Sequence, residues 1–191
     1  MFIDLVKKSR SIRRFYGDKE ITIEQLEELV DLARLSPNGS NKQALRYALV
    51  CEPVLNAKVY ENLFWAGYLT DWDGPVEEER PTGYIIMLRD KSLVNTMTID
   101  EGIAAQSIFL GAYHMGLGGC FFGSIKREEV KKALNIGDNY DIALIIALGY
   151  PKEEVVIDEV KEDGDIKYYR DENNVHHVPK RRLEDIIIKI N

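Results

Sequence analysis

The chain has 191 residues, 45% hydrophobic and 30% charged, a composition ordinary for one soluble domain with its own core. Its net charge of −7 argues against general affinity for nucleic acid, and no apolar run approaches the ~20 residues of a membrane span. The two cysteines, Cys51 and Cys120, lack metal-site spacing, so we expect no metal, reduced thiols and a cytoplasmic protein.

The first fifty residues predict two helices and a strand. Residues 2–9 form a short helix with its apolar side chains on one side. Thr22 and Gln25 fit a capping box at the start of a second helix, which should end near residues 36–37. The apolar run 47–51 then predicts a buried strand.

Residues 65–81 interrupt this pattern and predict an irregular excursion. Trp65, Tyr68 and Trp72 lie here among glycine, proline and charged residues, so the segment is a candidate lid over a substrate. The simpler interpretation of the three rings is local packing. A second buried strand follows at residues 84–88.

The third quarter predicts a long helix over residues 98–116. It is apolar on more than one face, which is typical of a central helix or of one at a subunit interface. A short strand or turn is expected at 119–123, with Ser124 as the cap of a helix over 126–134. Residues 143–149 predict a third buried strand.

The last forty residues, 152–191, are more polar and form a C-terminal extension. Asp163 and Gly164 suit a turn, and the apolar segment 183–190 is expected to dock, for example on another subunit. No internal repeat or linker is present, so we expect a single domain over residues 1–191.

Two basic stretches suggest a site for one discrete anion. Eight of the 25 lysine and arginine residues lie in 7–14 and 180–182 of an otherwise acidic chain. Between them are the polar segment 36–43 and the glycine-rich run 116–123. Each segment alone is typical of surface charge or of a loop, but together they offer the guanidinium groups, hydroxyls and main-chain amides that bind a phosphate.

These segments resemble the motifs of the FMN-dependent nitroreductase family. Residues 10–15, Arg-Ser-Ile-Arg-Arg-Phe, are similar to the family's Arg-Ser-x-Arg-x-Phe start. Residues 36–43 are similar to its Ser-Pro-Ser-x-x-Asn-x-Gln segment. The glycine-rich turn at 116–123 and the Lys-x-Arg of 180–182 follow in the family's order, and the likeness covers most of the chain.

The resemblance implies an α+β fold, a three-layer α/β/α sandwich with a mostly antiparallel sheet, assembled as a homodimer with FMN at the interface. Arginine, serine and lysine side chains from both ends of the chain would surround the FMN phosphate. Arg13 would lie near the pyrimidine edge of the flavin, and the amide of Gly123 would face flavin N5. The implied cofactor-binding residues are Arg10, Ser11, Arg13, Pro37, Asn38, Gly39, Asn41, Gln43, Gly123, Ser124, Lys180 and Arg182.

The resemblance also implies an enzyme. NADH or NADPH would reduce FMN and leave, after which an electron-poor acceptor such as a nitroaromatic or a quinone would take the electrons. No side chain is required as an acid or a base. Two alternatives stay open: a flavin sensor or store without turnover, and a specialised flavin enzyme that performs reductive dehalogenation or flavin fragmentation. The side chains of the neighbouring residues His176 and His177 would point in different directions in an extended segment, which argues against a metal role for the pair.

Overall fold

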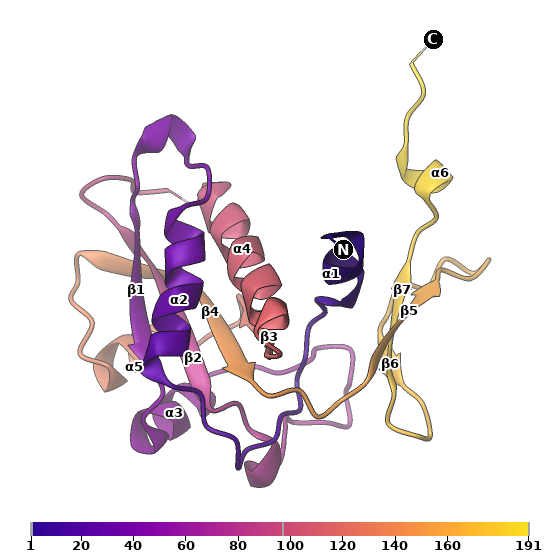
Figure 1. Ribbon diagram of the computed structural model, residues 1–191, viewed down its shortest axis with the longest axis horizontal. Helices are drawn as coiled ribbons and strands as arrows, with labels where there is room; N and C mark the ends of the chain where they lie inside the picture. Colours follow the sequence, from indigo (N-terminus) through magenta and orange to yellow (C-terminus); the bar gives the residue numbers. More distant parts are fainter. Residues whose placement is uncertain (1, 97, 191) are drawn as a thin grey trace.

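The computed structural model describes residues 2–96 and 98–190 (Figure 1). Its centre is a four-stranded sheet with the strand order β1-β2-β4-β3, in which every neighbouring pair is antiparallel. The predicted antiparallel sheet is therefore confirmed. The strands are β1 (Leu45–Val50), β2 (Gly83–Asp90), β3 (Gly118–Phe122) and β4 (Tyr140–Gly149).

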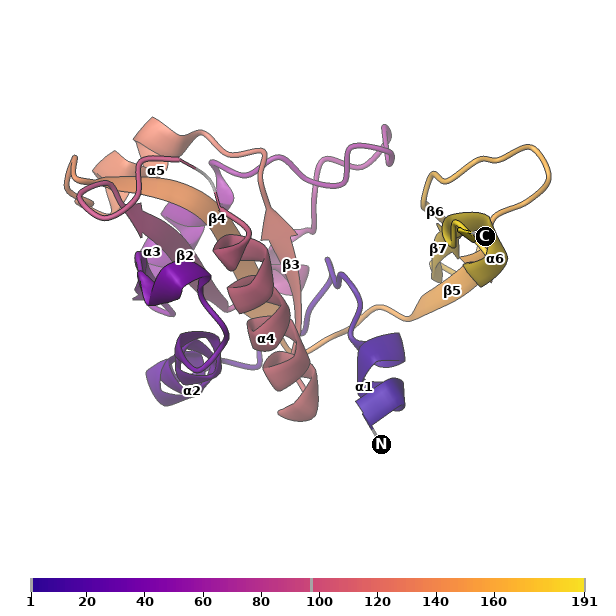
Figure 2. The ribbon, with the colours of Figure 1, turned by 90° about the horizontal axis from the view of Figure 1, so that it is seen from above.

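Helices cover both faces of this sheet, as Figure 2 shows for α2 and α4 on one side and α5 on the other. Successive side chains of β2 explain why, because they point to opposite faces. Ile85 and Met87 pack with α2 and α4, while Tyr84 and Ile86 pack with α3 and α5. The predicted three layers are confirmed. The helices are α2 (Ile23–Arg34), α3 (Pro53–Tyr60), α4 (Asp100–His114) and α5 (Arg127–Ala133).

Local signals set several of these boundaries. The capping box of α2 is present: the Thr22 hydroxyl accepts from the Gln25 amide, and the Gln25 side chain accepts from the Thr22 amide at 3.0 Å. The predicted cap of α5 was wrong. The N-cap residue of α5 is Lys126, whose side chain makes no capping hydrogen bond, and Ser124 lies two residues before it.

The C-terminal extension forms a second, smaller sheet beside the first (Figure 1). In this sheet β7 (His176–Lys180) lies between β5 (Val155–Glu159), to which it is parallel, and the short β6 (Tyr169–Arg170). Helix α1 (Phe2–Lys8) lies between the body and this sheet. We did not predict α3 or these three strands, and the single-domain interpretation stays a prediction.

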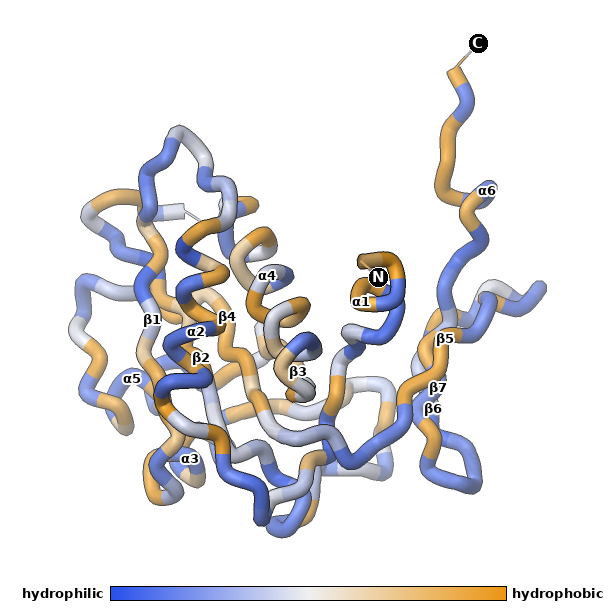
Figure 3. The backbone as a smooth tube through the Cα atoms, in the orientation of Figure 1, coloured by the Kyte–Doolittle hydropathy of each residue, from blue (hydrophilic) through white to orange (hydrophobic). Residues whose placement is uncertain are grey.

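Beyond β7 the chain runs outward through α6 (Leu183–Ile186) to an extended end (Figure 1). Figure 3 shows that this protruding end is largely hydrophobic. Ile188 is 87% exposed and Ile190 is 93% exposed. In the described part of the chain, no helix has both the length and the apolar character needed to cross a membrane.

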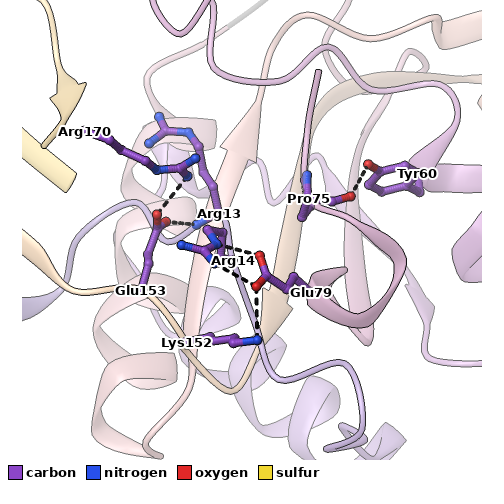
Figure 4. A network of polar contacts seen from close by, with 8 residues as sticks. All are labelled: Arg13, Arg14, Tyr60, Pro75, Glu79, Lys152, Glu153 and Arg170. Atoms are coloured by element: carbon purple, nitrogen blue, oxygen red, sulfur yellow. Dashed lines mark hydrogen bonds and ion pairs between the residues drawn. The ribbon is translucent and has the colours of Figure 1, made fainter. Parts of the chain in front are cut away.

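A nearly buried carboxylate fastens three distant parts of the chain together (Figure 4). Glu79 accepts two hydrogen bonds from the Arg14 guanidinium, at 2.5 and 2.7 Å, and lies 3.0 Å from the Lys152 ammonium. These contacts join the N-terminal segment, the end of the excursion and the connection after β4. Hydrogen bonding from Arg14, reinforced by Lys152, lowers the pKa of Glu79 to about 2.

Replacing this carboxylate by an amide should destabilise the fold in a pH-dependent way. Because the folded-state pKa is depressed, the stabilisation exists above the unfolded value and is lost as the pH falls towards 2. Glu79→Gln should lower the free energy of unfolding at pH 7 by about 2 to 3 kcal/mol. Urea denaturation at pH 7 and pH 3 measures this, and the difference from the unchanged protein should shrink at pH 3.

The exposed neighbour Glu78 provides the matched control, and Glu78→Gln should leave the unfolding free energy nearly unchanged. Equal effects of the two substitutions at pH 7 would contradict the role assigned to the Glu79 carboxylate.

Candidate functional site

The first and third sequence motifs lie side by side, although they are far apart in the chain. Ser11 forms a parallel bridge with Gly119 of β3, and the Ile12 amide donates to the Gly119 carbonyl at 2.8 Å. A Cβ at Gly118 would lie 2.7 Å from the Ile12 side chain, so glycine is what permits this approach. The two segments therefore form one surface.

Beside this bridge lies a cavity of about 340 Å³ between α1, α4, β3 and β5. Lys7, Lys8 and Arg10 give it a cationic wall, and Phe109 and Leu117 give it apolar ones. Glu153 also lines it and is paired with Arg170 at 2.9 Å. Within residues 2–96 and 98–190, the Arg10 guanidinium donates only to main-chain carbonyls, at 2.7 Å in both bonds. Burial lowers the pKa of Arg10, but the group remains a cation without a carboxylate partner.

The second motif, residues 36–43, folds as a tight loop above α2 and α4 (Figure 1). Asn38 accepts from the Gln43 amide at 2.8 Å, and the Gly39 amide donates to Asp100 at 3.0 Å. Pro37, Asn38, Asn41 and Gln43 line a separate cavity of about 160 Å³. No hydrogen bond or ion pair among the described residues connects this loop to Arg10 or Gly123.

The C-terminal cations also lie apart from the first motif within one chain. Lys180 ends β7 and is exposed. Arg182 pairs with Asp185 at 3.2 Å and also approaches Glu184 and Glu159; the Asp185 contact is the main cause of its raised pKa. Among residues 2–96 and 98–190, neither Lys180 nor Arg182 forms a hydrogen bond with Arg10 or Ser11.

Gly123 and Ser124 lie at the exposed end of β3, one of the two edge strands of the sheet. A Cβ added at Gly123 would meet nothing within 4 Å. Gly123 accepts from Arg127 at 3.0 Å, and Ser124 accepts from the Phe64 amide at 3.2 Å. The end of β3 is thus firmly held, with open space in front of its glycine.

The three candidate substrate-binding rings differ in their surroundings. Trp65 lies in the core, 4.7 Å from the Phe122 ring and 6.1 Å from the Trp72 ring, as the local-packing interpretation expects. Tyr68 lies 5.0 Å from the Tyr168 ring. The face of Trp72 is covered by the Arg170 guanidinium at 4.2 Å. The excursion, residues 65–81, therefore packs against the C-terminal extension. A role for the three rings in substrate binding stays a prediction.

Arg13 of the first motif has partners that the sequence did not reveal. Its amide donates to Glu153, and its guanidinium lies 3.1 Å from His176 Nε2 and 4.8 Å from the centre of the Tyr168 ring. His176 and His177 do diverge. His177 Nδ1 lies 2.8 Å from Asp158, and no cluster suited to a metal exists among the described residues.

Comparison with known proteins identifies the family of this chain. The family model for the nitroreductase family matches residues 6–150. The chain therefore belongs to the nitroreductase family.

Three similar proteins illustrate the relationship. A protein of Archaeoglobus fulgidus, described as an NADH dehydrogenase/NAD(P)H nitroreductase, is 27% identical over 80% of this chain and 86% of its own. The FMN reductase (NADPH) of Bacillus subtilis is 26% identical over 78% of this chain and 65% of its own. The solved FMN-dependent nitroreductase of Clostridium difficile R20291 has a TM-score of 0.64 and 24% identity, covering 80% of this chain and 88% of its own, and supports the fold.

Proposed function

We propose that the protein is an FMN-dependent oxidoreductase that uses NADH or NADPH to reduce electron-poor acceptors of the nitroaromatic or quinone type, in two successive half-reactions. The observation that carries the proposal is the hydrogen-bonded contact of Ser11 and Ile12 with Gly119, which joins two family motifs into one surface. Family membership and the names of the curated relatives support it.

The residues at this surface fit FMN. The Arg10 guanidinium has no carboxylate partner among residues 2–96 and 98–190 and lies beside Lys7 and Lys8, as a phosphate site requires. The open space at Gly123 leaves room for a flat ring against the main chain. Bound FMN would accept hydride from the nicotinamide and pass electrons to the acceptor. The side chains bind and orient the cofactor, with Ser11 and Arg10 at the phosphate.

We further propose that two chains build each site. Within one chain, residues 36–43 and the pair Lys180 and Arg182 lie apart from Arg10 and Gly123. A second chain could supply the missing amides and cations. The exposed apolar end of the chain, 183–190, supports this proposal, because isolated hydrophobic segments of this kind gain free energy by docking.

The proposed activity is tested by anaerobic mixing of the FMN-loaded protein with NADH and, separately, with NADPH. We expect purified protein to be yellow, with one FMN per chain, and its flavin absorbance to bleach within seconds with one of the two reductants. Addition of a quinone should restore the colour. Persistent colour with both reductants would favour a flavin sensor or store, and a colourless protein that ignores added FMN would reject FMN binding itself.

Loss of the Arg10 guanidinium should weaken FMN binding. A hydrogen bond to a charged group contributes about 1.5–3 kcal/mol, so Arg10→Ala should raise the Kd for FMN roughly ten- to a hundredfold. Flavin fluorescence titration measures the change. Lys132→Ala is the control, since Lys132 pairs with Glu129 on the exposed face of α5, and it should bind FMN normally. An Arg10 variant with the control's affinity would remove Arg10 from the phosphate site.

Charges in the apolar C-terminal segment should dissociate the proposed dimer. In Ile186→Asp/Ile188→Asp, two exposed isoleucines become carboxylates that cannot be buried at an interface. We expect light scattering to give the mass of one chain, against two for the unchanged protein, together with weaker FMN binding. Val54→Asp on α3, at a position 62% exposed, is the control and should remain dimeric. A double variant that is still dimeric would exclude this segment from the interface.

A further inference from the structure

Arg13 is held by two aromatic side chains from the C-terminal extension. The guanidinium donates to His176 Nε2 at 3.1 Å and lies 4.8 Å from the centre of the Tyr168 ring. The Tyr168 and His176 rings are themselves 5.3 Å apart. The guanidinium is thus fixed by one hydrogen bond and by one cation–π contact.

The hydrogen bond fixes the state of the histidine. An arginine only donates, so Nε2 of His176 accepts and its proton resides on Nδ1. His176 is fully buried, and burial lowers its pKa to about 4, with the charges of Arg13 and Arg170 acting in the same direction. Nδ1 is buried without a partner among the described residues. The neutral imidazole of His176 therefore accepts a hydrogen bond from the Arg13 guanidinium and leaves its positive charge uncompensated.

The segment that carries both rings is braced from two sides. Arg170 binds the fully buried Glu153 at 2.9 Å, and the same carboxylate accepts from the Arg13 amide (Figure 4). On the other side the Arg170 guanidinium covers Trp72 at 4.2 Å. The main chain and guanidinium of Arg13 are thereby connected to the excursion through the β6–β7 hairpin, residues 168–177.

We infer that this hairpin is a positioning device for Arg13: neutral His176 and the face of Tyr168 hold the guanidinium in a set place beside the glycine-rich strand, where its charge stabilises the reduced, anionic flavin. The inference rests on the proposed function, and His176 and Tyr168 act through Arg13 as positioning residues. A charge held in place before the reaction stabilises a developing anion better than a mobile one, because nothing has to reorganise.

The test compares two variants of His176 in the FMN-loaded protein. His176→Leu removes the acceptor, whereas His176→Gln places an amide oxygen near the position of Nε2 and keeps it. The Kd values for oxidised and for reduced FMN are measured anaerobically, and their ratio reports the stabilisation of the reduced ring. We expect His176→Leu to reduce the preference for reduced FMN about tenfold, about 30 mV in the two-electron midpoint potential, and His176→Gln to stay within about twofold.

A double-mutant cycle separates positioning from a general structural effect. Arg13→Ala should itself reduce the preference for reduced FMN, and His176→Leu should then change it no further. Additive effects in the cycle, or equal shifts for the Leu and Gln variants, would overturn the inference. If the unchanged protein binds no FMN, the proposed function falls and this inference with it. If it binds FMN and His176→Leu leaves the ratio unchanged, only this inference falls.

Far-ultraviolet circular dichroism checks that each variant folds. Should His176→Leu fail to fold, Tyr168→Leu decides, because Tyr168 is only half-buried and its loss removes the second contact of the guanidinium. We expect a shift in the same direction with Tyr168→Leu, and none when Arg13 is already alanine. A folded Tyr168→Leu variant with the original ratio would overturn the inference.

Discussion

The extended segment 11–16 is the constraint on which the site depends. Its main chain is hydrogen-bonded in turn to β3, to the end of the excursion and to the connection after β4, through Ile12, Phe15 and Tyr16. The apolar and the charged side chains of this segment have different surroundings. Ile12 and Phe15 are buried, whereas the two arginines between them reach polar partners. A short run of sequence thereby fixes the first motif against the glycine-rich strand.

Much of the central fold was predictable because its signals are local. The capping box gave the start of α2, and continuous apolar runs gave three strands of the main sheet. Helix α3 also has a local signal that we did not use: Glu52 accepts from two amides of the first turn, which begins with Pro53. The strands β5 and β7 have no such signal, because each is short and becomes a strand only through pairing with the other.

Part of the candidate site was predictable from the sequence motifs. The resemblance assigned residues 10–15 and 116–123 to one cofactor site, and in the structure Ser11 of the first segment bridges Gly119 of the second. The sequence did not show that the loop 36–43 lies at the start of α4, where the Gly39 amide donates to Asp100, while Arg10 lies near the end of that helix. Local patterns carry no information on this tertiary placement. It also did not reveal the partners of Arg13, since Tyr168 and His176 reach it only through the tertiary placement of the hairpin.

The two neighbouring arginines differ in the partners of their guanidinium groups, a carboxylate for Arg14 and two aromatic rings for Arg13. Arg14 donates two hydrogen bonds to the Glu79 carboxylate, which also pairs with Lys152, so the Arg14 guanidinium is engaged in holding the fold together. Arg13 has no carboxylate within ion-pair distance of its guanidinium among the described residues. Glu153, the nearest acid in its network, binds the Arg13 amide and is neutralised by Arg170. The cluster of Arg13, Arg170 and Glu153 therefore keeps one net positive charge, and a neutral histidine holds that charge in place without cancelling it.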